Sequence, residues 1–268
     1  MGVINATPDS FYGGSRCTDT DAAVARATVM DANGAAILDI GGESTRPGAD
    51  SISIEEEARR VMPIIMRLTG MCSAALSIDT RKPAIARAAL DAGVHIVNDV
   101  SAGADPEMFT VVREYNAGIV LMHMHGTPAT MQTQPLDAEN AMETLLAFFQ
   151  RRIDAAVASG ISPACIVLDP GLGFGKTARA NERIVRDLPA LTALGFPIMV
   201  GASRKWFIGA RTGGDPETRL AGTLAAHVLA FSRGARIIRT HDVAATRDAL
   251  LVAAGIELDQ SPGGGCNS

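Results

Sequence analysis

The sequence has few cysteines, no long apolar run and no basic segment, and each absence argues against a class of protein. Its four cysteines are scattered, without paired metal-ligand spacing, so we expect reduced thiols rather than disulfides or zinc. No apolar stretch is long enough to cross a bilayer, and nothing like a signal peptide opens the sequence. With a formal charge of −5, neither nucleic acid nor a membrane is an expected partner. The expected location is cytoplasmic.

Short apolar segments alternate with longer helical patterns along the chain, which has 268 residues, 47% of them apolar. The expected strands are residues 1–6, 36–41, 74–79, 95–99, 118–124, 165–169, 197–202 and 236–240. The expected helices are residues 21–33, 54–68, 83 to about 93, 106–115, 137–159, 181–194, 216–232 and 242–254. This order predicts a single-domain α/β protein, a closed parallel (β/α)8 TIM barrel over residues 1–258, with an open doubly wound sheet as the alternative. Residues 259–268 are expected to form a disordered tail.

The segment from Ile166 to Lys176 shows how a strand is expected to end. Three apolar residues run into Asp169, and Pro170 and a glycine-rich turn follow. This pattern predicts a buried strand that stops at the acid. Because α/β proteins hold ligands at the carboxyl ends of their strands, Asp169 is predicted to lie at the rim of a binding site.

Most of the expected strands end in polar residues in the same way. These residues are Asn5, Asp39, Asp79, Asn98, Asp99, His123, Asp169, Ser203, Lys205, Arg239 and His241. One such residue more often caps a loop or pairs locally. A whole set converging on one barrel end would have to lose hydration together, and this predicts a ligand that compensates the buried charges.

Two kinds of ligand chemistry are represented in this set. Arg46, Arg239 and His241 suit an anion such as phosphate or pyrophosphate, and Asn5 with a nearby carboxylate suits an oxygen-ligated Mg²⁺. The remaining residues suit a flat heterocycle, because carboxylates accept its N–H groups, a lysine donates to its carbonyl, and Phe174 and Met122 either stack on it or pack in the core. The polar members of this second group are Asp79, Asn98, Asp169 and Lys205.

Two motifs suggest a nucleotide-binding loop and a metal site, but neither is complete in this sequence. The sequence GLGFGKT at residues 171–177 resembles a P-loop, but Pro170 occupies the position of its first glycine. His123 and His125 would share one face of a strand and could bind a metal, yet no further histidine or cysteine cluster joins them. A polar loop entrance is therefore the preferred interpretation of this pair.

Eight segments together resemble the dihydropteroate synthase family of pterin-binding barrels. They are MGVINATPDSF (1–11), DIGGESTRPG (39–48), SIDT (77–80), VND (97–99), MHMHGTPATMQ (122–132), LDPGLGFGK (168–176), GASRK (201–205) and IRTHD (238–242). They occur in the family's order and span most of the chain. The resemblance implies condensation of 6-hydroxymethyl-7,8-dihydropterin diphosphate with 4-aminobenzoate, which gives 7,8-dihydropteroate and pyrophosphate.

The resemblance also assigns roles by position. The pterin site would contain Asp79, Asn98, Met122, Asp169, Gly173, Phe174 and Lys205. The diphosphate site would contain Asn5, Thr45, Arg46, Arg239 and His241, with Asn5 binding Mg²⁺. The aminobenzoate site would contain Thr45, Arg46, Pro47 and Ser203. The catalytic set would be Asp79, Asp169, Lys205, Arg46, Arg239 and His241. The family further implies a homodimer that associates through its late helices.

The sequence departs from the family pattern in its first loop, where Tyr12 and Gly13 follow Phe11, and at Trp206 after the key lysine. The sequence given starts directly at the expected first strand, whereas relatives usually have a short preceding segment that covers the bottom of the barrel. A sulfonamide-insensitive variant stays an open interpretation. Two alternative functions are a methyltetrahydrofolate–corrinoid methyltransferase on the same barrel and a non-catalytic pterin-binding barrel.

Overall fold

Eight parallel strands, hydrogen-bonded in chain order, form a single sheet. This computed structural model describes residues 1–6, 16–44, 48–127, 130–131 and 133–258. The strands are β1 (Gly2–Asn5), β2 (Ile37–Gly41), β3 (Ala75–Asp79), β4 (Ile96–Asp99), β5 (Gly118–Met122), β6 (Ile166–Asp169), β7 (Ile198–Val200) and β8 (Ala235–Ile238). The sheet closes on itself, because the N–H of Val3 donates to the carbonyl of Thr240 (3.1 Å) and the N–H of Thr240 donates to the carbonyl of Met1 (2.9 Å). The predicted closed barrel is confirmed.

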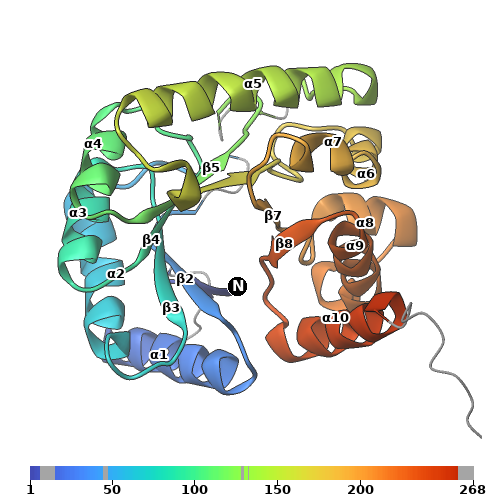
Figure 1. The fold of residues 1–268 in the computed structure, drawn as a ribbon. Coiled ribbons are helices and arrows are strands. Elements are labelled where there is room, and N and C mark those ends of the chain that lie inside the picture. The colour runs from blue at the N-terminus through green and yellow to red at the C-terminus, as the bar shows by residue number, and fades with distance from the viewer. Residues whose placement is uncertain (7–15, 45–47, 128–129, 132, 259–268) are drawn as a thin grey trace, which may run out of the picture.

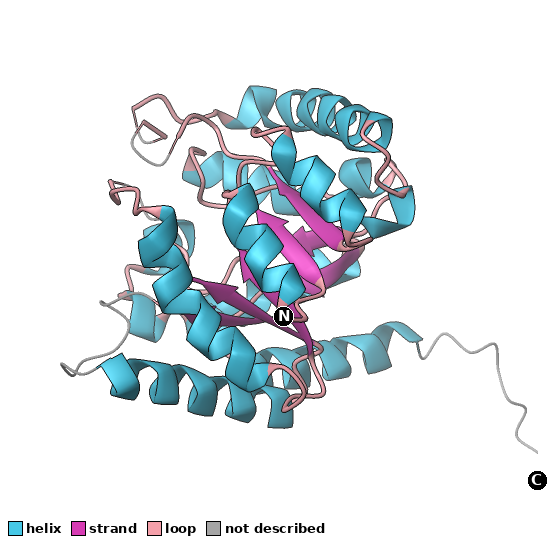
Figure 2. Ribbon diagram, turned by 90° about the vertical axis from the view of Figure 1, so that its left-hand side faces the viewer, coloured by secondary structure: helices cyan, strands magenta, loops and turns pink. Residues whose placement is uncertain are grey.

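Helices form an outer ring around the strands (Figure 1). They are α1 (Arg16–Ala32), α2 (Ile54–Leu68), α3 (Pro83–Asp91), α4 (Glu107–Glu114), α5 (Ala138–Ala158), α6 (Ala178–Arg186), α7 (Pro189–Thr192), α8 (Trp206–Thr212), α9 (Leu220–Ser232) and α10 (Val243–Leu258). The view turned by 90° shows the strands enclosed by this helical layer (Figure 2). Within the described residues, none of these helices is long and apolar enough to cross a membrane.

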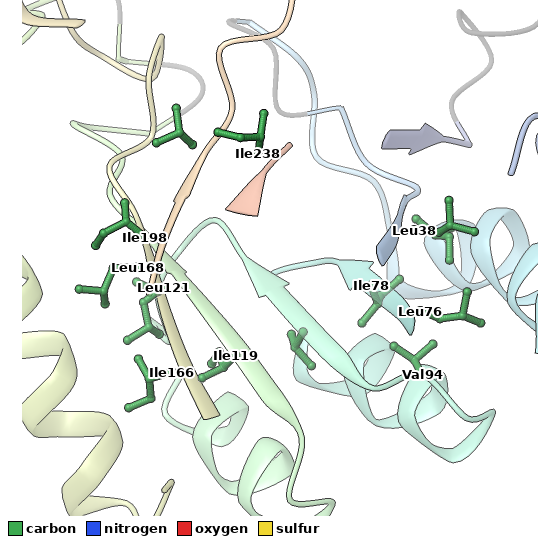
Figure 3. Close-up of a cluster of buried hydrophobic side chains, with 14 of the residues drawn as sticks. Leu38, Leu76, Ile78, Val94, Ile119, Leu121, Ile166, Leu168, Ile198 and Ile238 are labelled. Carbon is green, nitrogen blue, oxygen red and sulfur yellow. The ribbon is translucent and has the colours of Figure 1, made fainter. Parts of the chain in front are cut away.

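The hydrophobic core lies between the barrel and the helices. Alternate residues of each strand contribute to this core, because successive side chains point to opposite faces of a sheet. On β2, Leu38 and Ile40 are fully buried in this core. Figure 3 shows Leu38 together with core residues of other strands, of which Leu76 and Ile78 belong to the neighbouring strand β3. Each such side chain contributes about 1.5–3 kcal/mol through burial. The alternate residues of the same strand, Ile37 and Asp39, face the barrel axis.

The structure corrects the sequence-based helices in several places, and α1 already begins at Arg16, five residues earlier than expected. The helix expected over residues 181–194 is two helices, α6 and α7, separated near Pro189, since proline cannot donate the next helical hydrogen bond. The helix expected from residue 216 begins at Leu220, after a 3-10 turn. The sequence analysis missed α8 altogether, because seven residues are too few for a periodic pattern. Its end is marked by Gly213 in the left-handed conformation (φ 71°).

Candidate functional site

The inward face of the barrel changes from apolar to polar within two residues on several strands. At the amino ends, a cavity of about 200 Å³ is lined by residues that include Ile37, Ile96, Val120, Val167 and Ile237. Two positions further along the same strands stand Asp39, Asn98, Met122, Asp169 and Arg239. Because alternate residues share a face, these side chains also lie toward the axis, at the carboxyl end. The predicted convergence of polar strand ends on one mouth is thereby explained for these strands. Asp99 is an exception, because it alternates with Asn98 on β4 and its carboxylate accepts hydrogen bonds from Ser101 and from the N–H of Gly103.

Asp39 lies at the centre of an acidic cluster in this mouth. Its carboxylate is fully buried and accepts hydrogen bonds from Ser77 Oγ (2.7 Å), Asn98 Nδ2 (2.9 Å) and Arg239 Nε (2.7 Å). Arg239 Nη2 donates to Asp79 Oδ2 at 2.8 Å. One guanidinium therefore bridges two carboxylates drawn from different strands, and the cluster as a whole has an excess of negative charge.

Burial and the neighbouring charges shift the protonation equilibria of the cluster. Burial raises the pKa of Asp79, Arg239 opposes this rise and Asp39 adds to it, and the resulting pKa is about 7. Burial opposes the charge on Arg239, yet Asp39 and Asp79 raise its pKa above the ordinary value. Among the described residues, the buried Oδ1 of Asn98 has no hydrogen-bond partner. A ligand N–H could satisfy this acceptor, because buried polar atoms rarely stay unpaired.

Asp169 and Lys205 form the second part of the mouth. Asp169 Oδ1 accepts from the N–H of Gly171 at 2.7 Å, and burial raises the pKa of its carboxyl group although Lys205 lowers it. Burial lowers the pKa of Lys205 to about 8. The Lys205 ammonium donates to the Leu172 carbonyl and lies 4.5 Å from the centroid of the Phe174 ring. This cation–π contact holds the flat ring of Phe174 beside the charges of Asp169 and Lys205.

The glycine at position 173 makes room for Lys205. Gly173 has φ +84°, and a Cβ atom there would lie 3.1 Å from Lys205 Cδ. A larger residue would be strained in this conformation and would crowd the lysine stem. Gly173 is further held by Asn181, whose Oδ1 accepts from its N–H at 2.7 Å.

Ser203 and His241 lie together at the ends of β7 and β8. The Oγ of Ser203 accepts from the N–H of His241 (3.1 Å) and lies 3.0 Å from His241 Nδ1. Burial, and next Arg239, lower the pKa of His241 to about 4. At pH 7 this histidine is therefore a neutral hydrogen-bonding group, and Arg239 is the permanent cation beside it.

The predicted pterin residues and the predicted anion residues share one site. Lys205 interacts electrostatically with Asp169, Arg239 and Asp79, so it connects the two parts of the mouth. Met122 is buried next to Asp169 in the β5–β6 register. Asn5 ends β1, half-buried, opposite Gly41 in the register. The predicted residues Thr45, Arg46 and Pro47 and the departures at Tyr12 and Gly13 lie outside the described residues, as does the expected 259–268 tail.

The sequence analysis gave no role to three groups that support the site. Asp39 was recognised only as a polar strand end, although a buried acid in an apolar strand was a usable signal. Lys176 was considered only as part of a failed P-loop. An ionic cluster that includes Glu43, just after β2, was not anticipated, because its partners are far apart in sequence: Lys82 Nζ donates to both Glu43 and the buried Glu57.

The fold and the site define an α/β barrel with a polar ligand site at the carboxyl ends of its strands. The family model described as "Pterin binding enzyme" matches residues 1–241. A dihydropteroate synthase from Synechocystis is 44% identical over 255 residues, covering 94% of this chain and 88% of the relative. The chain belongs to the pterin binding enzyme family.

Solved structures agree with this assignment. Xanthomonas albilineans dihydropteroate synthase with 4-aminobenzoic acid superposes with a TM-score of 0.91 at 44% identity, covering 96% of this chain and 92% of that one. The same enzyme in complex with 7,8-dihydropteroate gives a TM-score of 0.87 at 41% identity, with 96% and 93% coverage. At these identities the likeness extends beyond the fold to the family.

Proposed function

We propose that this protein is a dihydropteroate synthase. It condenses 6-hydroxymethyl-7,8-dihydropterin diphosphate with 4-aminobenzoate and releases pyrophosphate, as a step of folate biosynthesis. The observation that carries the proposal is the joint placement of Asp79, Asn98, Asp169, Lys205 and Arg239 in one buried mouth. The relatives named as dihydropteroate synthases support it.

The pterin ring fits the buried acceptors and the lysine. Asn98 Oδ1 and the carboxylates of Asp79 and Asp169 accept N–H groups, and Lys205 donates to the ring carbonyl. Both carboxylates favour positive charge that develops on the ring. Met122, Gly173 and Phe174 provide the apolar face on which the ring lies. The ring is thus bound through hydrogen bonds that also assist the chemistry.

The reaction needs no covalent intermediate with the protein. The bond between the exocyclic methylene carbon and the diphosphate oxygen breaks, and its electron pair leaves with pyrophosphate. The neutral amine of 4-aminobenzoate then forms the new C–N bond and loses a proton. Arg239 supplies positive charge for the leaving group, and neutral His241 supplies a hydrogen bond. Thr45 and Arg46 are assigned to the diphosphate by their positions in the family motif.

A magnesium ion is compatible with the donor set at the mouth. Asn5 provides one half-buried amide oxygen at the end of β1. The described residues contain no group of three or more histidine, cysteine or acidic side chains that could hold a metal. Mg²⁺ takes few protein ligands and completes its shell with substrate phosphates and water. When bound, the ion would neutralise charge on the leaving diphosphate.

The aminobenzoate site is assigned to the segment after β2 together with Ser203. The cluster of Glu43, Arg81, Lys82 and Glu57 braces this segment: Arg81 Nη2 donates to Glu43 at 3.0 Å, and Lys82 Nζ donates to Glu43 at 2.9 Å. Burial would raise the pKa of Glu43, but Arg81 and Lys82 lower it to about 2. Glu43 is therefore charged at neutral pH. The same cluster also holds residues beyond 47, because the N–H of Ile52 donates to Glu43 Oε1 (3.4 Å) and Arg81 Nη2 donates to Ser51 Oγ (3.0 Å).

Purified protein incubated with pterin diphosphate and 4-aminobenzoate tests the proposal. We expect pyrophosphate and 7,8-dihydropteroate in equal amounts. Methyl transfer from a methylated folate to a corrinoid without pyrophosphate release would instead indicate the methyltransferase, and tight pterin binding without any turnover would indicate a binding protein. Titrating a sulfonamide against 4-aminobenzoate in the same assay decides whether the enzyme is the insensitive variant.

We further propose a cytoplasmic homodimer. Large apolar side chains are exposed on the late helices, including Leu229 on α9 and Leu251, Val252 and Ile256 on α10, with exposed fractions of 48–73%. Such a patch favours association. The free thiols of Cys72 and Cys165 suit a reducing compartment. Light scattering of the wild type and of Leu251→Glu tests the dimer: equal masses would contradict this interface.

A further inference from the structure

Lysine is rare in this chain, and its lysines lie at the carboxyl end of the barrel, where the site is. The sequence contains only Lys82, Lys176 and Lys205, and its other cationic side chains are arginines. Lys82 braces the segment after β2, and Lys205 faces Asp169. Lys176 is the most deeply buried of the three, with 1% of its surface exposed, and the reaction outlined above gives it no part.

The ammonium of Lys176 is bound by main-chain carbonyls alone. Its Nζ donates to the carbonyls of His123 (3.1 Å), Gly171 (2.9 Å) and Phe174 (3.0 Å). These three bonds use all three N–H donors of an ammonium group. They join the exit of β5 to both sides of the 170–175 turn, the turn whose Gly173 and Phe174 lie against Lys205.

We propose that Lys176 is a positioning residue for the pterin site. It is a buried cation that holds the 170–175 turn against the exit of β5, and its charge stabilises the ionised form of Asp169. This inference rests on the proposed function, since it concerns how that site holds its pterin substrate.

The tightness of the turn explains the choice of residue. A Cβ atom on Gly171 would lie 2.1 Å from the His123 carbonyl oxygen, and one on Gly175 would lie 2.2 Å from the His125 carbonyl oxygen. In such close packing a planar guanidinium is too large, and an ammonium on a slender stem can meet three converging carbonyls. A neutral side chain would leave these buried acceptors unsatisfied.

The charge of Lys176 also reaches the substrate acid. Lys176, Lys205 and Arg239 are the positive charges that lower the pKa of Asp169 against the effect of burial. Asp169 in turn supports the charge on Lys176, although burial lowers the pKa of this lysine to about 7. His123, at the exit of β5, also packs against Lys176. Its side chain is neutral, because burial lowers its pKa to about 2. Loss of Lys176 should therefore make Asp169 easier to protonate.

The experiment compares Lys176→Met with Arg179→Met, which removes an exposed positive charge from the first turn of α6. For Lys176→Met we expect the KM for pterin diphosphate to rise at least about tenfold, since three charge-assisted hydrogen bonds are lost. We expect little change in the KM for 4-aminobenzoate. The acid limb of kcat/KM for the pterin should shift to higher pH, and Arg179→Met should match the wild type in all three measurements.

Two results would overturn the inference. One is a Lys176→Met enzyme that is less stable to heat but keeps the pterin KM and the acid limb of the wild type, since this is a structural role only. The other is an equal shift in Arg179→Met. If Lys176→Met does not fold, Lys176→Gln, which keeps neutral donors, takes its place with the same criteria. Absence of turnover in the wild type would reject the proposed function, while pterin affinities by calorimetry would still decide the role of Lys176.

Discussion

The two ends of the barrel are built from the same strands and have opposite chemistry. At the amino end, Ile37 and Val167 line an apolar cavity. Two residues later on the same strands, the buried carboxylates of Asp39 and Asp169 face the mouth. One end therefore gains stability from burial, whereas the other holds charges whose loss of hydration must be offset by ion pairs and a ligand. The apolar residues that stabilise the barrel and the charged residues that form the site are therefore only two positions apart on each of these strands.

The largest effect is expected from Arg239→Met, which leaves two buried acids without their shared partner. Breaking such a pair typically costs about 3–5 kcal/mol, so we expect a clear loss of stability at pH 8 and a fall in kcat/KM of more than about 100-fold. Urea unfolding and steady-state kinetics measure the two losses. Arg236→Met, on the exposed side of the same strand, is the control. Equal behaviour of the two variants would contradict the central place given to Arg239.

Asp169→Asn is expected to weaken pterin binding strongly while the fold is retained. The substitution keeps the shape of the side chain but removes the charge, and hydrogen bonds to a charged group contribute about 1.5–3 kcal/mol. We expect the dissociation constant for the pterin to rise about 10- to 100-fold in calorimetry. An affinity close to that of the wild type would show that the ring does not bind at this acid.

A smaller effect is expected in the pH dependence of stability, and it comes from Asp79. The folded pKa of about 7 lies above the ordinary aspartate pKa of 3.8, so between these limits the folded protein holds a proton that the unfolded chain releases. This contribution to the unfolding free energy is complete below about pH 4 and is lost as the pH rises through 7. Unfolding titrations at a series of pH values should show the slope in the wild type and a weaker one in Asp79→Asn. Parallel curves would refute it.

The smallest effect on function is expected at the amino end. Ile119 is fully buried and lines the apolar cavity, so Ile119→Val should lower the unfolding free energy by about 0.5–1.5 kcal/mol. Because the site lies at the other end, both KM values should stay within experimental error. A changed pterin KM would show that the two ends are coupled, and the contrast between them would no longer hold.

Local patterns were enough to predict the strands and their polar ends. Asp79, Asp169 and Arg239 each follow a short apolar run, and parallel strands bring such ends together in any closed barrel. The bounds of α6 were predicted less well and α8 was missed, because short helices depend on tertiary packing more than on periodicity. The pairing of Arg239 with Asp39 and Asp79 was not predictable either, since these partners are 200 and 160 residues apart.

The sequence by itself determined the barrel, the end at which the site lies and the residue types that line it, because alternation along a strand and turn chemistry are local properties. Only the tertiary structure decided which charges are paired. It made Asp39 the hub of the acidic cluster, left Asn98 Oδ1 without a partner among the described residues, and buried the Lys176 ammonium among three carbonyls. Pairing depends on distances through space, and closure of the sheet sets those distances.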